Sequence, residues 1–293
     1  MLRCRLESLG VSLPREGLVR WGSLYHAVRA GNECFARSHY RRSDIQVLIN
    51  SGVHRDGHVC EPAIASHVLR ALDINVDFRG ARTLGFDLLN GGCGMLNAAH
   101  VMATMMQAGE VHVGMLVSSE ANTDQHPDPA FPYPASGAAA LVDISPFPHR
   151  GFGAFAFRTH DEHAELYSSV VSLAERNGRL VLRRRAELED LYLAAAGEVV
   201  EELLARDELR RDQIECVIPA QLSPSFVARL GGAIGLPGER VVDLTAELPD
   251  TLSTSVFLAL HEARRARRVR TGQRALLMAF GSGITVGATT YRF

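Results

Sequence analysis

Cys93 stands in a run of glycines that could hold a nucleophilic thiol. The segment FDLLNGGCGMLN, residues 86–97, joins the end of an expected strand to the start of an expected helix. The dipole of a helix N-terminus favours a thiolate, which can accept an acyl group as a thioester. The alternative is a small buried residue in a tight turn, because cysteine often packs as a small hydrophobe. The segment alone leaves both interpretations open.

Histidines are the other side chains that could do chemistry. His54 and His58, and the motif HDEH at residues 160–163, could in principle bind a metal. None of them lies in a recognised metal-binding motif, and the five cysteines include no CxxC pair. We therefore expect neither a metal site nor a disulfide framework.

Hydrophobic patterns predict the elements that position Cys93. Apolar runs predict strands, and apolar residues at helical spacing predict helices. The first half of the chain gives strands at 44–52, 83–90 and 111–120, with helices at 62–74 and 95–110. This order of strands and helices is typical of an α/β sheet with helices packed on its faces.

A similar order returns in the second half of the chain. Helices are predicted at 189–209, 223–235 and 254–269, and strands at 214–221, 241–245 and within 273–293. The order strand, elbow, helix, strand around Cys93 is repeated near the C-terminus, which indicates an internal duplication. We expect two similar halves, residues 1–150 and 151–293, sharing one core.

Four segments together resemble the thiolase superfamily, and specifically its ketoacyl synthase III group. They are SLGVSLP (8–14), FDLLNGGCGML (86–96), YPASGAAALV (133–142) and the ending AFGSGITVGATTYRF (279–293). The resemblance implies a five-layer α/β/α/β/α fold with two duplicated halves. It also implies a protein that handles acyl groups on coenzyme A or on acyl carrier protein.

The resemblance further implies a catalytic cysteine, histidine and asparagine. In the family the cysteine lies five residues after the Asp of an FD pair and two residues before a Gly. The same count from Asp87 and from Gly94 gives Gly92 in this chain. The family's PHQ histidine corresponds to Ala220, and the asparagine of its GNTS motif corresponds to Asp250. We therefore expect a degenerate set of catalytic positions.

Two features bear on whether Cys93 could still act. A one-residue bulge before the helix would bring Cys93 into the position of Gly92; without it, the thiol is rotated by about 100°. The family's second oxyanion donor lies in the C-terminal glycine turn, where this chain has Ser282 between two glycines. A serine there would be strained if the position required a positive φ.

The expected partners also follow from the resemblance. The chain is short between Pro14 and Asp44 and lacks a clear copy of the segment that covers coenzyme A in the family, so we expect no bound cofactor. An acidic acyl carrier protein could dock on a basic run comprising Arg264, Arg265, Arg267 and Arg268. Acyl-CoA remains the other acyl donor. We also expect a homodimer, or a heterodimer with a homologue, formed through an edge strand near residues 111–120.

Composition adds limits on location and partners. The 293 residues carry a formal net charge of -2, which gives no reason to expect nucleic acid or membrane as partners. The N-terminus has no apolar core followed by a small-residue cleavage site, so a cytoplasmic protein is expected.

Two functional hypotheses remain. In the first, the chain is a non-condensing ketoacyl synthase III-like subunit of fatty-acyl or secondary-metabolite biosynthesis, which pairs with an active homologue. In the second, it is an atypical acyltransferase that uses Cys93 to move an acyl group from a coenzyme A or carrier-protein thioester.

Overall fold

The computed structural model describes residues 3–13, 22–75, 82–172 and 178–293. Of the stretch between Pro14 and Asp44, in which no clear copy of a coenzyme A segment was expected, residues 14–21 lie outside the described residues. In the first half the elements are β1 (Cys4–Ser12), α1 (Ser23–Ala36), β2 (Val47–Asn50), α2 (Ile64–Ala71), β3 (Leu84–Asp87), α3 (Gly94–Gln107), β4 (Val113–Glu120) and β5 (Ser136–Ile144).

The second half begins with the strand that follows β5. Its elements are β6 (Gly151–Thr159), β7 (Tyr167–Ser172), β8 (Arg179–Arg184), α5 (Leu188–Arg206), β9 (Cys216–Pro219), α6 (Pro224–Ala233), α7 (Ser255–Arg265), β10 (Arg274–Gly281) and β11 (Thr285–Arg292). Two short 3₁₀ turns matter for the site: η3 (Gly91–Cys93) precedes α3, and η7 (Leu252–Thr254) precedes α7.

The two halves build sheets of matching topology. One sheet has the order β1-β5-β4-β2-β3, and the other has the order β6-β11-β10-β9. In each sheet an antiparallel pair adjoins a set of parallel strands, and Val241 extends the second sheet by a single parallel bridge to Val217. The strand expected at 241–245 is therefore reduced to one bridge. The division of the chain at residue 150 stays a prediction.

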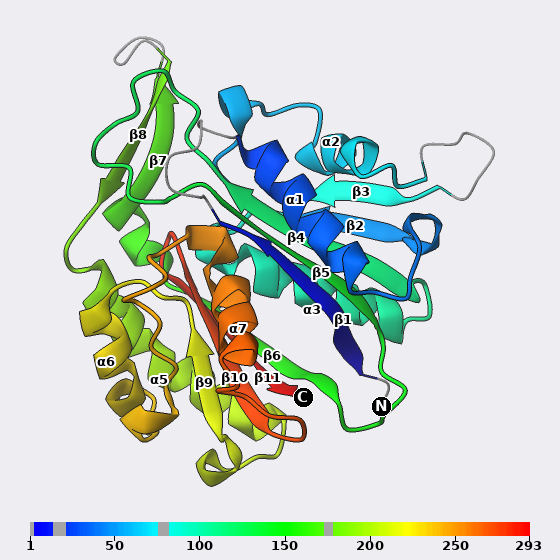
Figure 1. Ribbon diagram of the computed structural model, residues 1–293. Helices are drawn as coiled ribbons and strands as arrows, with labels where there is room; N and C mark the ends of the chain where they lie inside the picture. Colours follow the sequence, from blue (N-terminus) through cyan, green and yellow to red (C-terminus); the bar gives the residue numbers. More distant parts are fainter. Residues whose placement is uncertain (1–2, 14–21, 76–81, 173–177) are drawn as a thin grey trace.

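The elements stack in five layers, as the resemblance implied (Figure 1). Helices α1 and α2 pack on the outer face of the first sheet, and α5 packs on β6 and β11 of the second, with α6 beside it. Helices α3 and α7 each contact strands of both sheets, so they form the middle layer. Because α3 is enclosed on both sides, its methionines Met95, Met102 and Met106 are buried in the core.

The edge strand differs from the expected one. Strand β4 lies between β5 and β2 and is buried along its whole length, so it has no free edge for pairing across a dimer. A continuous apolar run is typical of such a central strand. Within the described residues, β3 is the outermost strand on that side of the sheet, and Leu84 on it is 54% exposed.

No helix in the described part of the chain is both long and apolar enough to cross a membrane.

Candidate functional site

The elbow before α3 is built by two glycines with different roles. Gly91 has a φ of +49°, a left-handed conformation that glycine adopts at little cost. Gly92 lies against the backbone of β10: a Cβ added there would collide with the carbonyl oxygen of Phe280. Position 92, to which the motif count assigned the family's nucleophile, therefore has no room for a side chain in this backbone conformation.

Cys93 is the last residue of η3 and is completely buried. Its Sγ lies 3.3 Å from the carbonyl oxygen of Thr285, to which the thiol donates a hydrogen bond. The sulfur packs close to Gly281 and Gly287 on the last two strands. Burial raises the pKa of the Cys93 thiol far above its ordinary range, and a thiol in apolar surroundings is unreactive.

Asp250 lies at the end of a loop, just before η7. Its side chain is 10% exposed, and its Oδ1 accepts a hydrogen bond of 2.9 Å from the backbone N–H of Leu252. Desolvation by burial raises the pKa of Asp250 to about 6, against the lowering effects of the Leu252 hydrogen bond and of Arg184. At neutral pH the carboxyl group is thus largely ionised, despite the unfavourable surroundings.

Arg184 on β8 links Asp250 to a second carboxylate. Its Nη2 lies 2.8 Å from Glu189 Oε1, and its Nη1 lies 3.9 Å from Asp250 Oδ2. Glu120 also acts on Asp250, since its negative charge favours the protonated acid. Sequence reasoning missed Arg184 and Glu189, because no local motif marks residues so far along the chain from the elbow.

Two tyrosines lie beside the same group of charges. The hydroxyl of Tyr133 donates a hydrogen bond of 3.2 Å to that of Tyr167. Burial raises the pKa of Tyr167 to about 12 and that of Tyr133 further. Both side chains stay neutral at physiological pH and offer hydroxyl groups to the site.

Ala220 follows β9 and is buried beside β10. Its backbone N–H donates to the carbonyl oxygen of Met278 over 2.9 Å. The neighbouring Gln221 is buried, and its backbone N–H donates to the hydroxyl of Ser255 at the start of α7. The end of β9, where the resemblance assigned the family's histidine position to Ala220, is thus held by backbone hydrogen bonds and carries only a methyl group at position 220.

Ser282 lies in the turn between β10 and β11, facing the elbow. A Cβ added at Gly91 would lie 3.0 Å from Ser282 Oγ, so the turn and the elbow are in close proximity. Ser282 has no positive φ; the positive values in this turn fall on Gly283 (+68°) and Ile284 (+31°). The unfavourable positive φ that was considered for Ser282 is therefore found at the β-branched Ile284.

Three of the histidines considered as metal ligands pair with a carboxylate. His54 Nδ1 lies 2.7 Å from Glu120 Oε2, and His58 Nε2 lies 2.7 Å from Asp124 Oδ1. His160 of the HDEH motif lies 3.5 Å from Glu162, near the surface. Across the described residues, no three His, Cys, Asp or Glu side chains are grouped so as to hold a metal ion.

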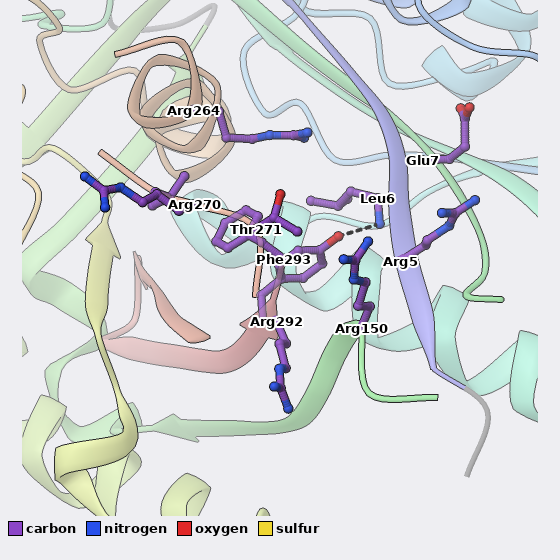
Figure 2. Close-up of a pocket in the computed structure, with 11 residues that line it drawn as sticks. Arg5, Leu6, Glu7, Arg150, Arg264, Arg270, Thr271, Arg292 and Phe293 are labelled. Carbon is purple, nitrogen blue, oxygen red and sulfur yellow. Dashed lines mark hydrogen bonds between the residues drawn. The ribbon is translucent and has the colours of Figure 1, made fainter. Parts of the chain in front are cut away.

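The basic run contributes to an arginine-lined pocket at the far end of α7. Figure 2 shows this pocket, of about 280 Å³, with Arg264 and Arg270 from the run. The other arginines that line it are Arg5, Arg150 and Arg292. Arg5 is paired with Asp143 at 2.7 Å, a buried carboxylate.

The rest of the run is held by neighbouring groups. Arg265 lies 2.6 Å from Glu262, and Arg268 donates to the carbonyl oxygen of Asp243 over 2.8 Å. Arg267 adopts a positive φ of +56° just after α7. Since α7 has 11 residues, its length of about 16 Å separates the run from the site at its N-terminus.

Comparison with known proteins identifies relatives over most of the chain. Residues 204–293 match the family described as 3-oxoacyl-[acyl-carrier-protein (ACP)] synthase III C terminal. The beta-ketoacyl-[acyl-carrier-protein] synthase III of Actinobacillus succinogenes is 26% identical over 260 residues, covering 84% of this chain and 77% of that protein. That of Nitratidesulfovibrio vulgaris is 35% identical over 96 residues, which cover 33% of this chain and only 29% of the relative.

Solved structures extend the likeness to the whole fold. The crystal structure of beta-ketoacyl-[acyl carrier protein] synthase III from Thermus thermophilus superposes with a TM-score of 0.84 and covers 99% of both chains, at 21% identity. The five layers, the matching sheets and the elbow before α3 agree with this likeness. The chain therefore has the thiolase-like fold of this synthase, and its residues 204–293 match the C-terminal model of the synthase III family.

Proposed function

We propose that this chain is a non-condensing ketoacyl synthase III-like subunit that pairs with an active homologue in fatty-acyl or secondary-metabolite biosynthesis. The observation that carries the proposal is the chemistry at the three family positions, Gly92, Ala220 and Asp250. The first has no room for a side chain, the second offers only a methyl group, and the third is an acid.

The charges around Asp250 support this proposal. Condensation of a malonyl thioester forms an enolate, which is stabilised by donors aimed at the developing negative charge. Here Asp250 and Glu189 bring two carboxylates to one arginine, Arg184. An ionised Asp250 would repel an enolate where a neutral amide would donate to it.

Carbon dioxide release tests the proposal directly. The purified chain, free of any homologue, is mixed with malonyl carrier protein and a range of acyl starters. We expect release at the background rate, while an active ketoacyl synthase III assayed in parallel serves as the positive control. Turnover by the chain alone near a typical enzymatic value of about 10 s⁻¹ would contradict the proposal.

The alternative is acyl transfer through Cys93. What supports the first proposal over this one is the burial of the thiol against the last two strands. Incubation with an activated acyl thioester, followed by intact-mass measurement and peptide mapping, separates the two. An acyl adduct on Cys93 would favour the alternative and count against an inert thiol.

The dimer that this proposal needs would form through β3. Within the described residues β3 has a strand neighbour, β2, on one side only, and Leu84 on it is 54% exposed. An unpaired edge with an exposed apolar side chain can continue its sheet into a second chain. The partner would be a second copy or a homologue with an intact site.

An acidic acyl carrier protein remains the proposed transient partner of the basic run. Arg264 and Arg270 line a pocket with three further arginines, which suits a phosphate or a carboxylate. The run lies about 16 Å from the start of α7, so a carrier docked there would sit at the opposite end of this helix from the elbow.

A further inference from the structure

A serine, a histidine and a glutamate are linked in series by hydrogen bonds, and none of them occupies one of the three family positions. Ser169 Oγ lies 2.9 Å from His54 Nε2, and His54 Nδ1 lies 2.7 Å from Glu120 Oε2. Ser169 comes from β7, His54 from the loop after β2, and Glu120 from the end of β4. We propose that Ser169, His54 and Glu120 form a nucleophilic triad that accepts an acyl group from a thioester or an activated ester. The proposal does not rest on the proposed function.

The hydrogen bonds of Glu120 set the tautomer of His54. Glu120 Oε1 accepts from the backbone N–H of Val53 over 3.0 Å and from the hydroxyl of Ser253; Oε2 accepts from the backbone N–H of His54 over 3.0 Å. A carboxylate can only accept hydrogen bonds, so the bond to His54 Nδ1 requires a proton on that nitrogen. In the neutral ring the lone pair of Nε2 then faces the hydroxyl of Ser169, as a general base requires.

Aromatic rings hold the imidazole in this orientation. The ring of Phe131 meets that of His54 edge to face at 4.9 Å, and the ring of Tyr133 is stacked on it at 5.8 Å. His54 and Glu120 are 3% and 0% exposed. A base fixed by packing and by a buried carboxylate is preorganised for proton transfer.

The hydroxyl of Ser169 is accessible from a pocket. Ser169 is partly exposed, and together with His54 it lines a pocket of about 300 Å³. Most of the remaining wall is apolar and consists of Val53, Val59, Leu89, Val171 and Leu180. Leu89 and Val171 are 53% and 44% exposed, so the apolar surface continues to the mouth of the pocket. Such a wall fits the acyl part of a substrate.

The chemical step is an acyl transfer with ordinary proton movements. Ser169 Oγ attacks the carbonyl carbon of the thioester, and its proton passes to His54 Nε2. The new C–O bond forms while the C–S bond breaks, and the leaving thiolate takes the proton from His54. The product is an ester on Ser169, which water or another nucleophile can cleave by the same steps in reverse. Glu120 acts as a positioning residue for His54.

A fluorophosphonate probe tests the nucleophile on the full chain. Attack of Ser169 on the phosphorus releases fluoride and leaves a stable adduct, which peptide mapping assigns to a residue. We expect labelling of Ser169 in the wild type, none at that peptide in Ser169→Ala, and wild-type labelling in Ser168→Ala. Ser168 is the matched control, because neighbouring side chains of a strand point to opposite faces.

Glu120→Gln tests the role of Glu120 in positioning His54, because the two side chains have nearly the same shape. An amide can donate to His54 Nδ1 and so favours the wrong tautomer, and we expect the rate of labelling to fall by up to about 10⁴-fold. The melting temperature of each variant is measured alongside. A folded wild type that leaves Ser169 unlabelled would overturn the proposal, as would equal loss of labelling in Ser168→Ala. Both results are independent of carbon dioxide release and of any adduct on Cys93.

Discussion

The raised pKa of Asp250 makes the stability of the fold depend on pH in a way that one substitution should abolish. The carboxyl group has a pKa of about 6 in the folded chain, compared with an ordinary value of 3.8. A group whose pKa is raised by folding adds stability below its unfolded pKa, and that contribution is lost as the pH rises through the folded pKa. Ionised Asp250 therefore weakens the fold near neutral pH.

The size of this effect follows from the same two values. A pKa difference between 3.8 and about 6 corresponds to about 3 kcal/mol. Asp250→Asn has nearly the same shape, and its amide oxygen can still accept from the N–H of Leu252. Arg184 keeps Glu189 as a partner at 2.8 Å. The substitution thus removes the titration without leaving an unpaired arginine.

Urea unfolding between pH 4 and pH 8 measures the outcome. The free energy of unfolding of Asp250→Asn, relative to that of the wild type, should rise by up to about 3 kcal/mol from pH 4 to pH 7 and then level off. Asp243→Asn, at an exposed position of the same half, is the control variant. A relative stability that stays flat or falls with pH would refute the reasoning.

The elbow, the thiol and the edge strand each give a measurable expectation. Gly92→Ala should lower the free energy of unfolding by about 1–3 kcal/mol, because its Cβ collides with the carbonyl oxygen of Phe280; a variant as stable as the wild type in urea would contradict this. Iodoacetamide should modify Cys93 far more slowly than the exposed Cys60, as judged by peptide mapping, and equal rates would argue for an accessible thiol. Leu84→Lys should turn a dimer into a monomer in light scattering, whereas a dimer that persists would place the interface elsewhere.

Much of the fold could be predicted because its elements have strong local patterns. The apolar runs at 44–52 and 111–120 and the helical spacing at 95–110 indicate their elements directly, and β2, β4 and most of α3 lie within these ranges. Sheet order could not be read in the same way. It depends on which strands pair over long distances, and β4 was consequently expected at an edge although its apolar run suits the centre.

The candidate site could be predicted only where a motif fixes the count along the chain. The assignment of Gly92, Ala220 and Asp250 to the family positions follows from motif counts and stays a prediction. Arg184 and Glu189 come from the end of β8 and the start of α5 and carry no motif, so only the fold brings them to Asp250. The tautomer of His54 likewise depends on Glu120, which is 66 residues away.

Two features of the elbow, the glycine at position 92 and the buried thiol of Cys93, are physically coupled. With glycine at position 92 the carbonyl of Phe280 can approach the elbow closely, and Cys93 packs behind it against β10 and β11. A side chain at position 92 would need the end of β10 to move away, which would loosen the packing around the thiol of Cys93. The absence of a side chain at position 92 and the close approach of β10 are thus linked by packing. A single exchange at position 92 would not by itself make room for a side chain there, because the carbonyl oxygen of Phe280 lies in the way.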